Sequence, residues 1–252
     1  MVRYAGLLAG LWLIASPASA LEYWEVAYES RPVAAESALT AAERLSQIVR
    51  APVASRLVPF TDVAAILARH PEAPVIAEFP PIFFHALVDA GWRPIMRYRA
   101  NFSIQIFRDV GTDIAHDGLM FTPPRSTTAA AMAPAVLNQS VLGLARLQAA
   151  VSHTACIRGV VAGYAQGCVT APFFVNAYAD RFGIALEAVG PSLQTPPPVL
   201  FVTQAVSETQ IVQIQANLTE SKVAGFPLRP FIEMDFAAYE SMGELAADSG
   251  TF

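Results

Sequence analysis

The chain has 252 residues, of which 54% are hydrophobic and 15% are charged, and its formal net charge is −5. This acidic balance, with Lys222 as the single lysine, excludes the basic stripe that nucleic-acid and anionic-membrane binders carry. Any anion that the protein binds must therefore be held locally, by helix ends and chosen side chains. The length allows one large domain or two smaller lobes, and composition does not decide between them.

The first 20 residues are typical of a secretory signal peptide. The apolar run Ala5–Ala15 follows a start that carries one arginine, and Ser16–Ala20 ends in a small-residue cleavage motif. We expect cleavage after Ala20 and export to the periplasm. No later segment supplies the roughly 18–20 uninterrupted apolar residues that a membrane span requires.

The mature chain opens with strands and helices in alternation. Hydrophobic periodicity and turn residues predict, in order, strand 21–28, helix 34–49, strand 53–60, helix 62–70 and strand 74–77. Such alternation predicts an α/β fold with a mostly parallel sheet and helices on its faces. Ligands of such folds gather at the carboxyl ends of the strands.

The loop that follows the third strand, 78–87, is a candidate ligand wall. Phe79 and Phe83 could stack on a ligand and His85 could donate to it, although aromatic residues at this spacing are also typical of a core. The loop leads into a helix that stops at Gly91. Two further strands are predicted after it, at 92–99 and 102–108.

The central stretch, Gly118–Met132, reads as strand, loop and helix. Pro123 and Pro124 cannot continue a paired strand, and Ser126 or Thr127 can cap a helix that runs to residue 138. The first N–H groups of a helix lack intrahelical acceptors, so this turn can bind an anionic oxygen. Strand-to-helix turns with such a cap are also common in α/β proteins that bind nothing there.

The second half of the chain continues the alternation. After Val141–Ala149 and the pair Ser152 and His153, the predicted elements are helix 154–164, strand 167–170, helix 172–182, strand 186–190, strand 199–203, helix 207–220 and helix 234–245. Pro196–Pro198 is a stiff connection before strand 199–203. The last residues, 246–252, are expected to form a loose tail.

Cys156 and Cys168 are twelve residues apart in an exported chain, which favours a disulfide. The alternative is a pair of small buried apolar residues, since a bond needs Cα atoms within about 7 Å of one another. The absence of a Cys-x-x-Cys spacing argues against a redox role.

Three segments, Phe121–Ala129, Val151–His153 and Gly190–Val199, carry a family resemblance. With the order of elements over residues 22–221, they resemble the periplasmic substrate-binding proteins of the phosphonate, phosphite and phosphate type, which serve ABC importers. The resemblance implies a type II periplasmic binding protein fold, in which each of two α/β lobes is a mostly parallel sheet flanked by helices. The expected division is signal peptide 1–20, first part of lobe 1 in 21–108, lobe 2 in 109–196, and return to lobe 1 with the C-terminal helices in 197–252.

The resemblance also implies a site for a phosphorus oxyanion. The family usually has a Ser-Thr-Ser-Gly-like run where this chain has Ser126, Thr127, Thr128 and Ala129, and a histidine where His153 stands. The three hydroxyls and the adjoining N–H groups would hold the oxyanion, and His153 would donate from the opposing helix end.

The position of Gln166 bears on specificity. Members that bind aminoalkylphosphonates have a carboxylate shortly before the strand that begins here near Gly167, and Gln166 or Gly167 occupies that place. Gln166 is therefore a candidate ligand contact that carries no charge. A cationic amine would lack its counter-charge there, so we expect no amine pocket.

The resulting expectation is a monomeric solute-binding protein that captures a small oxyanion for an ABC permease in the inner membrane. It needs no catalytic residue, metal or cofactor, and no nucleic acid. A ligand-sensing partner of a membrane signalling protein would use the same closed form, so the sequence leaves that alternative open. A third alternative is a hydrolase or metal enzyme, but the spacings typical of such enzymes do not occur. Its candidate groups would be His85, His116 and His153 with Asp113 or Asp117.

Overall fold

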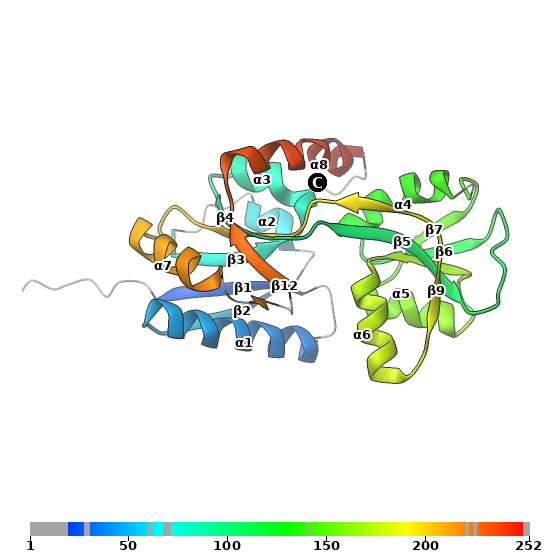
Figure 1. The fold of residues 1–252 in the computed structure, drawn as a ribbon, viewed down its shortest axis with the longest axis horizontal. Helices are drawn as coiled ribbons and strands as arrows, with labels where there is room; N and C mark the ends of the chain where they lie inside the picture. Colours follow the sequence, from blue (N-terminus) through cyan, green and yellow to red (C-terminus); the bar gives the residue numbers. More distant parts are fainter. Residues whose placement is uncertain are drawn as a thin grey trace, which may run out of the picture.

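The computed structural model describes residues 20–27, 31–59, 62–67, 72–140, 142–219, 222–223 and 226–248. In it the chain forms two α/β lobes, each built on one β-sheet with helices packed on its faces (Figure 1). The expected signal peptide falls on residues 1–20, of which 1–19 lie outside the described residues. Among the helices described, none combines the length and apolarity needed to cross a membrane.

The first lobe is built on a seven-stranded sheet in the described part of the chain. Its strands are β1 (Leu21–Ala27), β2 (Val53–Pro59), β3 (Val75–Phe79), β4 (Arg93–Tyr98), β10 (Val199–Val202), β11 (Lys222–Val223) and β12 (Phe226–Pro230). Their order across the sheet is β11-β12-β4-β10-β3-β1-β2. The strands from the start of the chain therefore pair with strands from its last third.

Side chains alternate between the two faces of this sheet along each strand, and a different set of helices packs on each face. Along β3, for example, Val75 and Ala77 point into one core and Ile76 into the other. The first core is closed by α2 (Val63–Leu67), α3 (Phe84–Asp89) and α8 (Phe236–Asp248), and the second by α1 (Arg31–Val49) and α7 (Glu208–Leu218). Two short 3-10 helices, η2 (Pro81–Phe83) and η3 (Glu233–Asp235), lead into α3 and α8.

The second lobe is built on a five-stranded sheet of order β7-β6-β8-β5-β9. Its strands are β5 (Phe102–Asp109), β6 (Leu119–Thr122), β7 (Arg146–Ala149), β8 (Gly167–Thr170) and β9 (Leu186–Thr195). One face packs against α4 (Thr128–Gln139), and the other against α5 (His153–Val161) and α6 (Pro172–Phe182).

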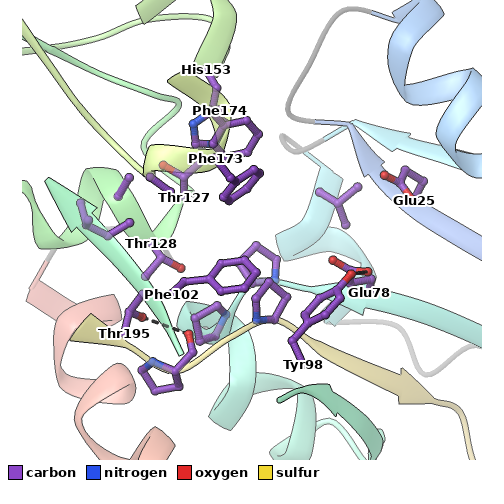
Figure 2. A pocket seen from close by; sticks show the side chains of 18 of the residues that line it. Glu25, Glu78, Tyr98, Phe102, Thr127, Thr128, His153, Phe173, Phe174 and Thr195 are labelled. Carbon is purple, nitrogen blue, oxygen red and sulfur yellow. Dashed lines mark hydrogen bonds between the residues drawn. The ribbon is translucent and has the colours of Figure 1, made fainter. Parts of the chain in front are cut away.

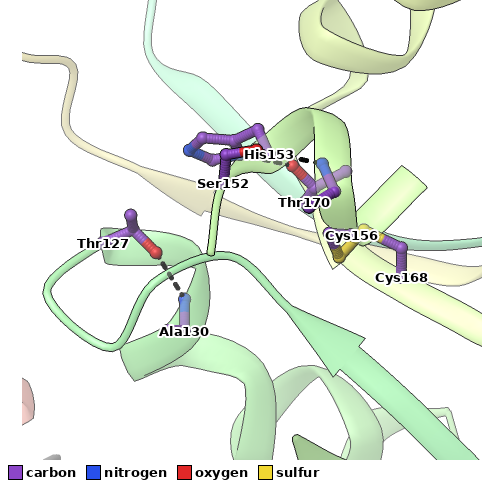
Figure 3. The surroundings of a disulfide bond; sticks show 8 residues. Thr127, Ala130, Ser152, His153, Cys156, Cys168 and Thr170 are labelled. Carbon is purple, nitrogen blue, oxygen red and sulfur yellow. Dashed lines mark hydrogen bonds between the residues drawn. A yellow bond between two sulfur atoms is a disulfide. The ribbon is translucent and has the colours of Figure 1, made fainter. Parts of the chain in front are cut away.

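Two features hold α5 tightly against this sheet. Cys156 on α5 is bonded to Cys168 on β8, with their Cα atoms 5.7 Å apart, so the structure contains the expected disulfide (Figure 3). Gly159 faces the ring of Phe121 on β6, and a Cβ atom at position 159 would lie 2.4 Å from that ring. The helix therefore approaches the sheet at a distance that only glycine permits at this position.

Two short connections join the lobes. The chain leaves β4 at Tyr98 and enters β5 at Phe102, and it returns from β9 to β10 through Pro196–Pro198. Phe102 is the register partner of Thr195, so β5 and β9 run side by side from the point where they leave the first lobe (Figure 1). Residues 102–108 were expected in the first lobe; because this segment pairs with β8 and β9, it belongs to the second sheet.

The α/β class with two lobes agrees with the expectation, but both sheets are mixed. Parallel pairing occurs at β1–β2, β1–β3, β6–β7 and β6–β8. The strands that border the connections, β4, β5, β9 and β10, pair antiparallel with their neighbours. The reason is topological: a chain that passes between lobes re-enters each sheet from the opposite end.

The predicted elements correspond to observed ones, with differences at β9 and near the C-terminus. Strands β11 and β12 were not predicted, because β11 has only two residues and β12 contains Pro227 and Pro230, which weaken a strand pattern. Strand β9 extends to Thr195 instead of ending at Gly190. Helix α8 continues to Asp248, so residues 246–248 are helical and not part of a tail.

Candidate ligand-binding site

A cavity of about 300 Å³ lies between the two sheets. It is lined by residues at the carboxyl ends of β1 and β3, by the N-termini of α4, α5 and α6, by Tyr98 and Phe102 on either side of the first connection, and by Pro196 and Pro198 of the second. This is the edge of an α/β sheet at which ligands are expected. The volume is at the lower end for small-molecule sites.

One side of the cavity, here named the donor wall, consists of Thr127, Thr128 and His153 on the second lobe (Figure 2). Thr127 is the N-cap of α4: its Oγ1 accepts from the N–H of Ala130 at 3.2 Å and donates to the carbonyl of Pro124 at 2.8 Å. The hydroxyl of Thr127 is thus used to form the turn. What it leaves for a ligand is the helix N-terminus itself.

The donors that remain at this helix end come from Thr128 and Ala129. Their backbone N–H groups stand at the first two positions of α4, where no intrahelical acceptor exists. The side chain of Thr128 is only 8% exposed, lines the cavity, and has no hydrogen-bond partner for its Oγ1 among the described residues. A buried hydroxyl left without a partner is costly, so a ligand group that accepts from it would be favoured.

His153 stands at the start of α5, behind the N-cap Ser152, whose hydroxyl accepts from the N–H of Ala155 at 3.0 Å (Figure 3). Its Nδ1 lies 2.9 Å from the hydroxyl oxygen of Thr170, and its ring stacks on Phe174 with centroids 3.6 Å apart. Burial lowers the pKa of His153 to about 3. The imidazole is therefore neutral at physiological pH and can offer the cavity a hydrogen bond, not a positive charge.

The opposite side, here named the acidic wall, consists of Glu25, Glu78 and Tyr98 on the first lobe (Figure 2). Glu25 and Glu78 are register partners on the parallel strands β1 and β3, so their side chains leave the sheet on the same face. The phenol of Tyr98 donates to Glu78 Oε2 at 2.8 Å, and that of Tyr23 donates to Glu25 Oε2 at 2.9 Å.

Burial, and after it the negative charge of Glu25, raise the pKa of Glu78 to about 7, against the hydrogen bond from Tyr98. Burial also raises the pKa of Glu25, opposed by the hydrogen bonds from Tyr23 and Ser37. Two carboxylates side by side in a partly buried site repel one another. The wall is therefore a place where a proton or a cation is favoured.

Between the two walls the lining is apolar. Phe102 and Phe173 form an edge-to-face pair with centroids 5.5 Å apart, and Tyr98 lies 5.7 Å from Phe102 (Figure 2). Pro80 and Pro81, which follow β3, and Pro196 and Pro198 of the second connection complete this middle section. Within the part of the chain that the structure describes, no lysine or arginine lines the cavity.

The structure brings three of the sequence-predicted residues together, Thr127, Thr128 and His153. Ser126, the fourth candidate on the donor side, is partly exposed and is not among the residues that line the cavity. Because Thr127 is the N-cap of α4, Ser126 precedes the cap and stands two residues before the first residue of the helix.

Phe79 and Phe83 do not form a ligand wall. They are 0% and 1% exposed and pack edge to face in the core of the first lobe, where Phe79 also contacts Trp92 and Phe201. Alternation along β3 explains the error, because the residue before Phe79 is Glu78, and it is Glu78 that faces the cavity. The loop lines the cavity through Glu78, Pro80 and Pro81, and Phe79 and Phe83 do not line it.

Gln166 also lies elsewhere. It precedes β8, at the amino end of the strand, and its Oε1 accepts from the N–H of Ala115 at 2.8 Å. The cavity lies at the other end of the same strand, where Ala171 lines it. Gln166 is therefore a loop-bracing residue, and its lack of charge says nothing about a ligand in this cavity.

Sequence reasoning missed Glu25, Glu78, Tyr98, Phe102 and Phe173. Glu25 and Glu78 each stand near the carboxyl end of a predicted strand, and that position was the available signal. The strand register that sets them side by side is a long-range property, which a local pattern does not contain.

The groups proposed for a hydrolase are not assembled. His85 Nε2 lies 2.9 Å from the carbonyl oxygen of Tyr239, His116 is exposed in a turn, and only His153 reaches the cavity. Asp113 pairs instead with Arg108 at 3.5 Å. The described residues contain no cluster of three or more histidine, cysteine, aspartate or glutamate side chains that could hold a metal ion.

Comparison with known proteins gives matches at the level of structure. No protein-family model and no curated protein sequence matches the chain. The binding protein component of an ABC phosphonate transporter from Pseudomonas aeruginosa superposes with a TM-score of 0.72 at 11% identity, over 92% of this chain and 88% of that one. PhnD1 from Prochlorococcus marinus in complex with methylphosphonate gives 0.70 at 12% identity, over 93% and 99%.

A TctC solute binding protein from Polaromonas is also similar, with a TM-score of 0.58 at 12% identity over 94% of this chain and 98% of that one. The three proteins share their overall architecture with this chain over almost its whole length, although their sequences have diverged. The chain therefore has the two-lobe α/β fold of the periplasmic solute-binding proteins.

Proposed function

We propose that the chain is a periplasmic solute-binding protein that captures a small solute bearing an oxyanion and delivers it to an ABC importer. The observation that carries this proposal is the cavity between the lobes, which residues of both sheets line. A solute enclosed there touches both lobes at once, so its binding can be coupled to their closure. Two proteins of similar structure, the binding protein component of an ABC phosphonate transporter and PhnD1 in complex with methylphosphonate, support the same class of ligand.

The donor wall is the place for the oxyanion. The N-termini of α4 and α5 both lie at this wall, and each supplies partial positive charge. The hydroxyl of Thr128 and the neutral ring of His153 add two hydrogen-bonding groups. Hydrogen bonds to a charged acceptor are roughly twice as strong as neutral ones, so this set can hold an anion without an arginine or lysine.

The acidic wall restricts the class of ligand further. An inorganic phosphate or phosphite would place its negative charge in the same small cavity as Glu25 and Glu78, with no described cation between them. An organic phosphonate or carboxylate keeps its charge at one end and can lay its carbon part against Phe102 and Phe173. We therefore favour an organic oxyanion over an inorganic one.

A thermal-shift screen of the mature protein, residues 21–252, tests the proposal. The screen contains phosphate, phosphite, methylphosphonate, 2-aminoethylphosphonate, sulfate and small carboxylates. A ligand present at 100 times its Kd adds about 2.7 kcal/mol to the free energy of unfolding. We expect at least one organic oxyanion to stabilise the protein by such an amount, and stabilisation by none of these solutes would contradict the proposal.

A matched pair of variants then tests the placement of the anion. Thr128→Val removes the unpartnered hydroxyl from the cavity and is expected to weaken binding about tenfold, the loss of one hydrogen bond to a charged group. Ser126→Ala removes a neighbouring hydroxyl that does not line the cavity and is the control. Equal affinities of the two variants for the ligand would show that the anion lies elsewhere.

Export is tested separately. We propose that the signal peptide is removed after Ala20, so that the mature protein begins at Leu21. Intact-mass measurement of the periplasmic protein is expected to give the mass of residues 21–252. A mass that includes residues 1–20 would contradict the proposed processing.

A further inference from the structure

The oxyanion site proposed above uses only the donor wall, and the acidic wall remains without a role in it. Glu25 and Glu78 nevertheless line the same cavity. A pair of carboxylates alone does not make a ligand site, because such a pair can share a proton and serve only the fold. The arrangement around this pair, and the opposite end of the cavity, give reasons to infer more.

The two carboxylates are placed against their electrostatic preference. As register partners on parallel strands they have Cα atoms about 4.8 Å apart and project from the same face of the sheet. Like charges directly opposite one another in a sheet are destabilising. The described groups that hydrogen-bond to them are Tyr23, Tyr98 and Ser37, which are all neutral donors and supply no opposite charge.

Their hydrogen bonding also leaves acceptor capacity toward the cavity. Tyr98 donates to Oε2 of Glu78, and Tyr23 donates to Oε2 of Glu25. A carboxylate has about four lone-pair sites on its two oxygens, so one or two donors do not exhaust either group. An ammonium carries three donors and no acceptor, which is the complement of what this wall presents.

At the other end of the cavity, the buried hydroxyl of Thr128 has no partner among the described residues. This is an independent sign of a missing ligand, because buried polar side chains in native proteins are nearly always hydrogen-bonded. The two ends of the cavity are therefore complementary to different ligand groups. The donor wall requires a hydrogen-bond acceptor, and the acidic wall requires a cation. The section between them is apolar and aromatic.

We infer that the acidic wall binds a protonated amine of the same ligand whose oxyanion lies at the donor wall. The ligand class is a small zwitterion, an ω-amino phosphonate or ω-amino carboxylate with a short carbon spacer. This inference rests on the proposed function, because it assumes that the cavity holds a solute. It revises the expectation of no amine pocket, which assumed a counter-charge near Gln166, at the far end of β8 from the cavity.

The cationic group that suits the acidic wall is a protonated amine with N–H groups, not a quaternary ammonium. Carboxylate oxygens with free lone pairs are satisfied by N–H donors, which a quaternary ammonium does not have. The aromatic side chains near the acidic wall, Tyr98 and Phe102, would favour either kind of cation by cation–π attraction. Comparison of amino compounds with their trimethylammonium analogues therefore separates the two.

Isothermal titration calorimetry with matched ligand pairs tests the inference. The pairs are 2-aminoethylphosphonate with ethylphosphonate, and β-alanine with propionate, each titrated at pH 8 into the mature protein freed of solute by unfolding and refolding. We expect the amino member of at least one pair to bind about tenfold tighter or more, since one charge-assisted contact contributes 1.4 kcal/mol or more. The trimethylammonium analogue is expected to bind less well than the amino member.

Variants assign the preference to the acidic wall. Glu25→Gln and Glu78→Gln are each expected to reduce the preference for the amino member to about threefold or less while binding of the matched anion is kept or improved. Glu22→Gln is the control, since it removes one charge from the same strand, but Glu22 bonds to Trp24 and does not line the cavity. Circular dichroism checks that each variant is folded.

Each outcome leads to a decision. If ethylphosphonate and propionate both bind at least as tightly as their amino partners, or if the preference survives both cavity substitutions, the inference is wrong and the proposed function stands. If the trimethylammonium analogue binds tightest, the acidic wall holds a cation but not through N–H donors, and the inference as stated is wrong. If no member of either pair binds, the inference is wrong, and the thermal-shift screen, which contains further oxyanions, decides whether the proposed function stands.

Discussion

The acidic wall and the donor wall face one cavity, yet they are built from different elements and carry different charge. The acidic wall is built from strands: β1 and β3 set Glu25 and Glu78 side by side, and β4 supplies Tyr98. The donor wall is built from the N-termini of α4 and α5 and has no ionised side chain, since burial keeps the pKa of His153 near 3. The contrast indicates that this cavity does not suit a ligand of uniform charge.

The two walls are also held in place by different kinds of interaction. The donor wall is held by caps, by the packing of α5 and by a disulfide, so its weakness is structural. The acidic wall is held by hydrogen bonds to two charged groups, so its weakness is electrostatic and depends on pH.

The largest expected effect comes from the disulfide behind the donor wall. Replacement of Cys156 and Cys168 by alanine is expected to lower the free energy of unfolding by about 3 kcal/mol, because the bond closes a loop of 12 residues' separation. Urea denaturation of the variant and of the oxidised wild type measures the difference. Reduction of the wild-type protein should reproduce the loss, and identical curves for all three samples would show that the bond is absent in solution.

The next effect concerns Glu78 and is expected to depend on pH. The folded protein holds the proton of this carboxyl more tightly than the unfolded chain, since its pKa rises from 4.5 to about 7. The free energy of unfolding of the empty protein should therefore fall as the pH rises from about 4.5 to about 7, and we expect roughly 2 kcal/mol after allowance for partial exposure.

Glu78→Gln should remove this loss. We expect the variant without ligand to be more stable than wild type at pH 8 by roughly 1–2 kcal/mol and nearly equal to it at pH 4.5. Glu22→Gln, on the same sheet but outside the cavity, is the matched control. Parallel stability curves of wild type and Glu78→Gln between pH 4.5 and pH 8 would mean that Glu78 ionises as in water.

A smaller effect is expected at the cap of α4. Thr127→Ala removes the side-chain acceptor for the N–H of Ala130 and the hydroxyl that donates to Pro124, at a cost of about 1 kcal/mol. Ser126→Ala should leave the free energy of unfolding nearly unchanged, because the cap is Thr127. If the two substitutions exchanged effects, the cap would have been assigned to the wrong residue.

The smallest expected effect is an absence of change. The ring signals of His153 in an NMR pH titration should stay constant between pH 5 and pH 8, because burial lowers its pKa to about 3. The same protein unfolded in urea provides the reference, with histidine titration near the usual value of about 6.5. Titration of His153 near neutral pH in the folded protein would make the donor wall cationic and would remove the contrast between the walls.

The donor wall could be predicted from sequence and the acidic wall could not, for a physical reason. Helix caps are local: Thr127 follows two prolines and precedes an alanine-rich run, so the turn and its N–H groups can be inferred from a short stretch. The acidic wall depends on the register between β1 and β3, whose partners Glu25 and Glu78 are far apart in the chain. Phe79 was predicted as a ligand contact and Glu78 was not, because an aromatic side chain is evident from the sequence. The face of the strand on which each side chain lies is not.

The connections between the lobes show the same limit. The three consecutive prolines Pro196–Pro198 indicate a connection in the sequence itself, and the chain does return to the first lobe there. The first connection, 99–101, has no such signal, and β5 alternates like any other strand, so its sheet could not be inferred locally. Its membership is decided by pairing with β8 and β9.

The most direct test of the account is a crystal structure of the mature protein with the tightest-binding amino compound of the matched pairs. We predict that its oxyanion lies within about 3.2 Å of the N–H groups of Thr128 and Ala129 and of the hydroxyl of Thr128. Its ammonium should lie at the same range from the carboxylates of Glu25 and Glu78. A ligand bound in the reverse direction, with its oxyanion against the acidic wall, or bound outside this cavity, would contradict the account.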